Sequence, residues 1–219
     1  MKVCSCKGQR GAFTATELIL VSFVIVILTA LLLPALRKPK ANVKASKVIC
    51  VNNLKQVGFA MRMWANDHGD QFSMSVSTNA GGYLELAQNG ELFRLFQILS
   101  NELITPRILV CPSDSERSRI ADFMRLTNGN ISFFVGLDAR KAESQTILSG
   151  DRNIAGGTLT RRGIIQVSTT NAVWGDNMHV KTGNLGLADG SVLQAAHLRR
   201  QLEQDQASRR TNVTRLAIP

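Results

Sequence analysis

A glutamate inside a long apolar run is the feature that most limits what this chain can fold into. Residues 13–33 read FTATELILVSFVIVILTALLL, and Glu17 is the only charged residue among them. A charged side chain in a membrane-spanning helix costs about 2.5–3.5 kcal/mol near the helix centre and less near its end. We therefore expect Glu17 to have a positively charged partner.

The apolar run is long enough to cross a bilayer. As one helix, residues 13–36 would measure about 36 Å at ~1.5 Å per residue, and the hydrocarbon core of a bilayer is ~30 Å thick. A secretory signal has a shorter apolar region of about 7–15 residues. An ordinary signal anchor is the alternative interpretation, but it gives no reason for Glu17.

The start of the run resembles a known processing signal. Ala12-Phe13-Thr14, with Glu17 at the fifth position after Ala12 and an unbroken apolar segment beyond it, resembles the type IV prepilin signal. Type IV pilins and the pseudopilins of type II secretion systems share this signal. The resemblance implies a leader of residues 1–12, cleavage between Ala12 and Phe13 by a prepilin peptidase, and N-methylation of Phe13. The new ammonium group of Phe13 would then be the partner of Glu17.

The resemblance also implies a location and partners. It predicts a single-pass protein of the bacterial inner membrane with its C-terminal domain in the periplasm, and a filament that is periplasmic or extracellular. The partners would be the inner-membrane assembly machinery and other pilin or pseudopilin subunits, in a homo- or hetero-polymer. The flanking charges favour the opposite orientation, because three cations lie in the leader and five lie between residues 37 and 47. We follow the resemblance, because the peptidase cuts a cytoplasmic leader.

Residues 37–69 are expected to be the amphipathic half of one long helix. Apolar residues recur there at alternating spacings of four and three, which places them on one helix face: Cys50, Leu54, Val57, Met61 and Trp64. The helix is expected to end near Gly69. The predicted fold class is therefore α+β and pilin-like, with a long N-terminal helix, transmembrane in its first half, packed on a small antiparallel sheet.

Residues 70–207 are expected to form the periplasmic α+β domain. Short strand-like segments occur near 131–136, 145–149 and 164–167, and a helix is expected near 195–207. Residues 108–114 also look like a short strand that ends in a proline turn. Asp189-Gly190 lies between two more strand-like runs and predicts a hairpin with a type I′ turn. Residues 208–219 are basic and polar and are expected to be a flexible tail.

Two cysteines and one histidine are candidate site residues. Cys4 and Cys6 leave with the leader, so Cys50 and Cys111 remain and can form a disulfide or stay as separate buried thiols. His179, nine further residues and Asp189-Gly190 resemble the H-X9-DG element of prepilin-like proteins from planctomycete and verrucomicrobial bacteria, for which the resemblance implies no chemistry. Three further stretches look similar to those proteins: 52–56, 111–114 and 150–153.

The sequence contains one candidate set of metal ligands. Major pseudopilins bind calcium in a loop of their β region, so the resemblance makes Asp151, Asp176 and Asp189 candidate oxygen ligands, although their spacing matches no EF-hand loop. Zinc at Cys50, Cys111 and His179 is not favoured, because the mature chain lacks a short cysteine pair. No other cofactor is expected.

Composition and motifs narrow the function. The formal charge is +10, but aromatics make up only 5% of the chain and do not alternate with Arg or Lys, which argues against a nucleic-acid module. No HExxH, Walker A, GxSxG or dinucleotide-binding loop is present, so we expect no enzyme and no catalytic residue. The expected function is a structural subunit of a type II secretion pseudopilus. The alternatives are a true type IV pilin of an adhesion, motility or DNA-uptake fibre, and a membrane-anchored binding domain that does not polymerise.

Overall fold

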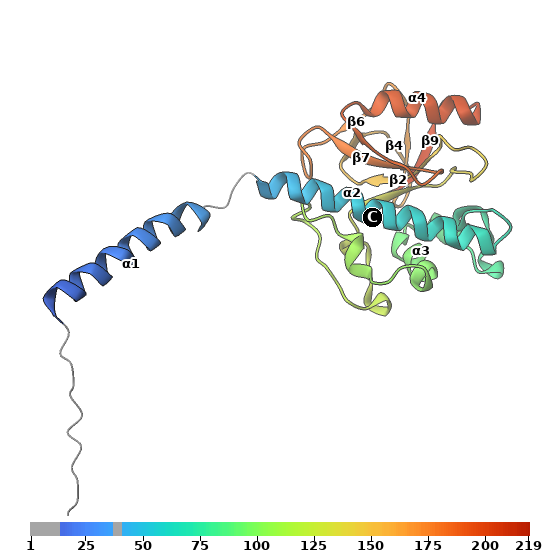
Figure 1. Cartoon of the computed structure of the whole chain (residues 1–219). Helices are drawn as coiled ribbons and strands as arrows, with labels where there is room; N and C mark the ends of the chain where they lie inside the picture. The colour runs from blue at the N-terminus through green and yellow to red at the C-terminus, as the bar shows by residue number, and fades with distance from the viewer. Residues whose placement is uncertain (1–13, 37–40) are drawn as a thin grey trace, which may run out of the picture. The chain divides into compact units, whose positions relative to one another are not determined.

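The computed structural model describes residues 14–36 and 41–219, with side chains described for 14–30 and 45–219. The chain divides into two compact units, Met1–Asn42 and Val43–Pro219, and Figure 1 shows the described elements of both. Within these described ranges, no helix combines the length and the apolar character that a membrane crossing requires.

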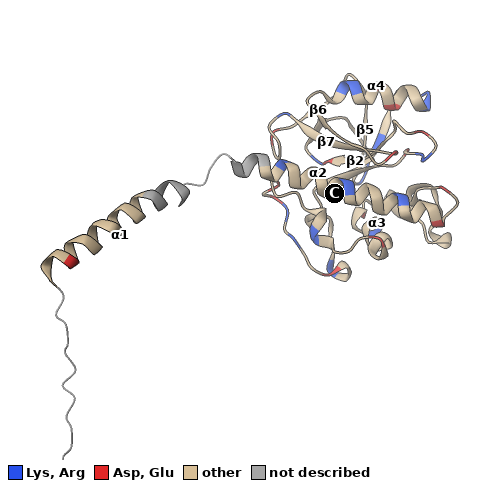
Figure 2. Ribbon diagram, in the orientation of Figure 1, with Lys and Arg blue, Asp and Glu red and all other residues tan. Residues whose placement is uncertain are grey.

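The described part of the first unit consists mainly of the helix α1 (Ala15–Leu36). Its N-terminus is closed by a capping box, in which the Thr14 amide donates to Glu17 Oε2 over 2.9 Å and the Glu17 amide donates to Thr14 Oγ1 over 3.4 Å. The Thr14 hydroxyl also donates to Glu17 Oε2, over 2.8 Å. All residues from 14 to 30 are exposed, and Figure 2 colours the described part of α1 tan except for one acidic position near its N-terminus. Glu17 therefore has a local role in starting this helix.

The helix α2 (Ala41–Asp67), which lies in the second unit from Val43 onward, has the expected amphipathic pattern. The predicted stripe is buried: Cys50, Leu54 and Val57 are 0% exposed, Met61 is 1% and Trp64 is 4% exposed. The helix ends where it was expected, since Gly69 adopts a left-handed φ of +64° just after it. Residues 37–40 of the predicted amphipathic half lie outside the described residues.

The second unit is an α+β fold built on antiparallel pairing. The main sheet has seven strands in the order β4-β5-β9-β1-β2-β7-β8, and a small second sheet pairs β3 with β6. Each of these strand pairs is antiparallel. In chain order the strands are β1 (Phe133–Gly136), β2 (Ile147–Asp151), β3 (Ile154–Gly156), β4 (Thr158–Arg161), β5 (Ile164–Val167), β6 (Ala172–Trp174), β7 (Gly183–Leu187), β8 (Val192–Ala195) and β9 (Thr214–Ala217).

Helices cover both faces of the main sheet. One core joins α2 and α3 (Leu92–Ile98) to one face, and a second core joins α4 (Leu198–Arg209) to the other face. Figure 1 shows α2 and α4 on opposite sides of the strands. Neighbouring residues of β1 divide between the two cores, because strand side chains alternate: Phe133 and Val135 pack with α2, and Phe134 packs with α4.

Short 3₁₀ turns connect α2 to the sheet. They are Ser73–Ser75, Thr78–Ala80, Leu86–Asn89, Leu99–Asn101, Pro106–Leu109, Phe123–Arg125 and Asn128–Asn130. The strand predicted within 108–114 is therefore wrong. Thr105 caps the turn that starts at Pro106, because the Thr105 hydroxyl accepts a hydrogen bond from the Arg107 amide over 3.4 Å. Proline is favoured at the first position of such a turn, where no backbone N–H is needed.

The hairpin predicted at Asp189-Gly190 is present, but its turn differs. Strands β7 and β8 pair across it, and the Gly190 amide donates to the Leu187 carbonyl over 2.9 Å. A type I′ turn needs positive φ at both central residues, yet of this pair only Gly190, at +89°, has one. The geometry is that of a three-residue loop closed by a left-handed glycine. The type I′ prediction is therefore wrong.

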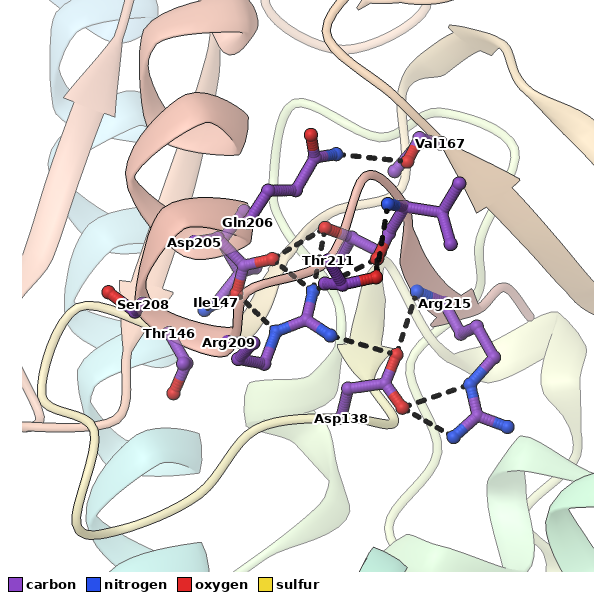
Figure 3. Close-up of polar contacts among 12 residues, drawn as sticks. Asp138, Thr146, Ile147, Val167, Asp205, Gln206, Ser208, Arg209, Thr211 and Arg215 are labelled. Carbon is purple, nitrogen blue, oxygen red and sulfur yellow. Dashed lines mark hydrogen bonds and ion pairs between the residues drawn. The ribbon is translucent and has the colours of Figure 1, made fainter.

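The prediction of a flexible tail at 208–219 is also wrong. Residues Thr214–Ala217 form β9, which lies between β5 and β1 inside the main sheet. Figure 3 shows how α4 holds this strand: Asp205 accepts from the Thr214 hydroxyl, pairs with Arg209 and accepts from the Ile147 amide of β2 over 2.9 Å. A short basic segment is stabilised here by partners distant in the sequence, which its own composition does not indicate.

Candidate functional site

Segments that are distant in the sequence meet at one buried place in the second unit. Cys50 of α2 and Cys111 form a disulfide with their Cα atoms 4.9 Å apart, and Asn53 Nδ2 donates to the Val110 carbonyl over 3.3 Å. The disulfide closes a sequence separation of 61 residues. On the chain-entropy account, such a loop stabilises the fold by about 4 kcal/mol. The pair considered from the sequence is thus bonded in the structure.

His179 contacts this disulfide from another part of the chain. Its Nε2 lies 3.5 Å from Cys111 Sγ and 3.4 Å from Asp151 Oδ2. His179 is 3% exposed, and both cysteines and Asp151 are 0% exposed. We call Cys50, Cys111, Asp151 and His179 the His179 cluster. The cluster is therefore a buried site made of four residues, which come from α2, a loop, the end of β2 and a second loop.

The loop 175–182 is bent so that His179 points inward. Asn153 fastens both ends, because its Nδ2 donates to the Gly175 carbonyl over 3.1 Å and to the Thr182 carbonyl over 3.0 Å. After His179 the backbone passes through two left-handed residues, Val180 at φ 41° and Lys181 at φ 55°. Such conformations cost about 1–3 kcal/mol each and persist only where the surroundings enforce them. Two strained backbone conformations, at Val180 and Lys181, therefore accompany the burial of His179.

Asp151 is held by a residue that the sequence did not suggest. Its Oδ2 accepts from the backbone amide and from the Nδ2 of Asn184 on β7, both over 2.8 Å. Its other oxygen, Oδ1, and the Nδ1 of His179 have no hydrogen-bond partner among the described residues. Buried polar atoms without partners are rare and call for an explanation.

Burial shifts both titrating groups of the cluster toward their neutral forms. It raises the pKa of Asp151 to about 7, against the opposing effect of the Asn184 hydrogen bonds. Burial lowers the pKa of His179, and the positive charge of Lys47 on α2 lowers it further. In a catalytic triad the nucleophile and the carboxylate bind different ring nitrogens, whereas here Cys111 and Asp151 both face Nε2. The geometry does not favour nucleophilic catalysis.

Beside the cluster, an ion pair joins Asp114, which follows Cys111 in the chain, to Arg152, which follows β2. Arg152 contacts Asp114 through two hydrogen bonds of 2.8 Å and also contacts Glu116 over 2.6 Å. The Asp114 side chain is 0% exposed and that of Arg152 is 10% exposed. Burial alone would raise the pKa of Asp114, but the hydrogen bonds and charge of Arg152 outweigh it and lower this pKa below its usual value.

Asp114→Asn is expected to lower the free energy of unfolding by about 3 kcal/mol at neutral pH, because it leaves a largely buried guanidinium without its counter-charge. The pKa of Asp114 is lower in the folded chain than in the unfolded chain, where it is about 3.9. Asp114 therefore stabilises the fold fully above about pH 3.9, and this stabilisation is lost as the pH falls through the folded-state pKa. The difference between parent and variant should therefore shrink below about pH 4. Denaturant unfolding across this pH range measures it.

Glu116→Gln is the matched control for that experiment. Glu116 contacts the same guanidinium, but its side chain is 56% exposed, so its loss should cost less than about 1 kcal/mol. Equal costs for the two variants, or a difference that does not change with pH, would contradict the role given to Asp114.

The other candidate residues lie elsewhere. Ala12 and Phe13, the predicted processing site, lie outside the described residues, and Glu17 caps α1 in the first unit. Asp176 and Asp189 are exposed, whereas Asp151 is buried. In the part of the chain that the structure describes, the one group of three or more His, Cys, Asp or Glu ligands is Cys50, Cys111 and His179. The structure does not gather the three aspartates proposed for calcium.

The two ends of the H-X9-DG element make different contacts. His179 belongs to the buried cluster, whereas Asp189 Oδ1 accepts the Ser191 amide over 2.8 Å inside its own turn. Arg62 of α2 donates to the Ala188 carbonyl in the same turn, and a Cβ at Gly190 would come within 3.3 Å of the Arg62 side chain. Because the Arg62 side chain is flexible and can shift, the feature that favours glycine here is the left-handed φ of +89°. The turn borders a mainly apolar groove of about 650 Å³, which Phe59, Met63 and Ile104 also line.

Comparison with known proteins adds no assignment to this geometry: no protein-family model, no curated protein and no solved structure matches this chain.

Proposed function

We propose that this protein is a structural subunit of a type II secretion pseudopilus, matured by a prepilin peptidase and assembled through its N-terminal helix. The observation that carries the proposal is Glu17, the single charge in the described apolar part of α1, at the fifth position after the expected cleavage site. Cleavage after Ala12 would create an ammonium group at Phe13, four residues from Glu17. In an apolar helix bundle, two opposite charges stabilise each other. An arrangement of subunits that leaves either charge without its partner is unfavourable.

The surface of α1 supports assembly. Its large apolar side chains are exposed all around the helix, from 44% at Ile27 to 69% at Ile19. A helix that is apolar on every side is normally covered by protein or lipid. We propose that the inner membrane covers it before assembly and that the α1 helices of neighbouring subunits cover it afterwards.

The second unit supports a pilin-like arrangement and a periplasmic location. An amphipathic helix, α2, packs its apolar stripe on an antiparallel sheet, which is the arrangement that the pilin resemblance implies for the second half of the long helix. The disulfide between Cys50 and Cys111 is typical of oxidising compartments such as the periplasm.

Mass spectrometry of the N-terminus of the protein from its native membrane tests this proposal. We expect a chain that begins at methylated Phe13 and lacks residues 1–12. An intact chain that retains Met1 would contradict maturation by a prepilin peptidase.

Shearing separates the proposed function from its alternatives. When this protein is overproduced together with its assembly machinery, we expect filaments that contain it to be released from the cells by shearing. Filaments at native expression levels would instead favour a true pilin, and a processed chain that stays monomeric in the membrane would favour an anchored binding domain.

A further inference from the structure

The His179 cluster has the donor types of a tetrahedral zinc site. Thiolates and imidazole are the preferred zinc ligands, and carboxylates also serve. Cys50, Cys111 and His179 present donor atoms that all lie within 4.8 Å of one another, and all three residues are buried. Asp151 Oδ2 also lies 3.4 Å from His179 Nε2, but Asp151 is not part of that group of three, so its carboxylate has to move toward the sulfurs to become the fourth ligand.

Two edges of the coordination tetrahedron already have the required lengths. With Zn–N and Zn–O bonds of about 2.0–2.1 Å and Zn–S bonds of about 2.3 Å, neighbouring donors lie about 3.3–3.4 Å apart for N and O and about 3.5–3.6 Å apart for N and S. The observed separations are 3.4 Å from His179 Nε2 to Asp151 Oδ2 and 3.5 Å from Nε2 to Cys111 Sγ. The two sulfurs would have to separate to about 3.8 Å, which requires that the disulfide be reduced.

The surroundings of the cluster suit a bound cation. Asn184 fixes the Asp151 carboxylate with two hydrogen bonds of 2.8 Å, as outer-shell residues do around metal ligands. Two thiolates, one carboxylate and Zn²⁺ carry a net charge of −1, and Lys47 supplies a positive charge close enough to act on His179.

We propose that the reduced chain binds one Zn²⁺ through Cys50, Cys111, His179 and Asp151, and that the disulfide and the zinc site are mutually exclusive states of the same residues. A dithiol reductant transfers two electrons and two protons to the disulfide and becomes a disulfide itself, leaving two protein thiols. Zinc binding then releases the two thiol protons, and the proton of Asp151 where it is protonated, to solvent. Oxidation of the two cysteines removes two ligands and expels the ion.

Cobalt spectroscopy tests this proposal on the full-length chain in detergent. The disulfide is first reduced under argon with a phosphine, which takes up oxygen from water and becomes a phosphine oxide as two thiols form. Titration with Co²⁺ should produce the intense visible bands of a tetrahedral thiolate site, saturating at one ion per chain, and Zn²⁺ should abolish them. The oxidised chain should show no such bands.

Variants identify the ligands. His179→Ala and Asp151→Asn should each weaken zinc binding by about tenfold or more, whereas His197→Ala, at an exposed histidine before α4, should leave it unchanged. Circular dichroism checks that each variant is folded. If Asp151→Asn fails to fold, the Cys50→Ser/Cys111→Ser pair replaces it and should show no thiolate bands.

Three results would overturn the zinc site. They are the absence of Co²⁺ bands in the reduced parent chain, equal binding by the oxidised and reduced chains, and full affinity after His179→Ala. None of these results bears on filament assembly, because the proposed function depends on Phe13 and Glu17 in the other unit.

Discussion

A Glu17→Gln variant is expected to be cleaved like the parent chain but to form no sheared filaments. Glutamine can still accept the Thr14 hydrogen bonds of the capping box, so α1 should begin at the same residue. The substitution removes the negative charge that we assign to the Phe13 ammonium. An ammonium left unpaired in an apolar bundle costs about 3 kcal/mol or more, which weakens each subunit addition by roughly 100-fold.

The two roles of Glu17 can be separated. Glu17→Ala removes the cap and the charge together, whereas Glu17→Gln removes the charge alone. Ser22→Ala is the control within α1, because Ser22 donates to the Leu18 carbonyl over 2.8 Å and carries no charge. We expect both Glu17 variants to be processed and to fail in assembly, as measured by the filament fraction after shearing.

A normal filament yield from Glu17→Gln would contradict the proposed ion pair between Glu17 and the Phe13 ammonium. If Glu17→Ala alone failed, helix capping rather than charge pairing would explain the glutamate.

An Asp205→Ala variant is expected to lose about 4 kcal/mol of stability, the largest loss that we expect from one substitution in the second unit. Asp205 is 1% exposed and accepts from the Ile147 amide, the Thr214 hydroxyl and Arg209. Its removal leaves a backbone amide and a largely buried guanidinium with fewer partners, and β9 loses a link to α4 (Figure 3). Denaturant unfolding of the purified chain measures the loss.

Glu203→Ala is the control on the same helix. Glu203 makes an exposed ion pair with Arg199, one turn away, and the loss of such a pair costs about 0.5 kcal/mol. A cost at Asp205 as small as that at Glu203 would contradict the anchoring role. Hydrogen exchange adds a second measure, since the amides of β9 should lose protection selectively in Asp205→Ala.

Local patterns in the sequence predicted several elements correctly. The apolar stripe of α2 was visible because helix periodicity puts residues three and four apart on one face, and the β7–β8 hairpin was visible because Asp189-Gly190 is a strong local turn signal. The capping box at Thr14 and Glu17 also has a local signature, although the interpretation of Glu17 as a membrane charge did not include it. The processing site at Ala12 and Phe13 stays a prediction.

The sequence by itself determined the elements whose signal lies within a few neighbouring residues: the apolar N-terminal segment, the amphipathic helix α2, the predicted strands that became β1, β2 and β5, and the hairpin. Only the tertiary structure decided that residues 214–217 lie inside the sheet and that His179 meets Cys111 across 68 positions. Those contacts form because the buried cores on the two faces of the sheet bring distant segments together. The local residue pattern of a segment does not indicate which distant segment it will contact.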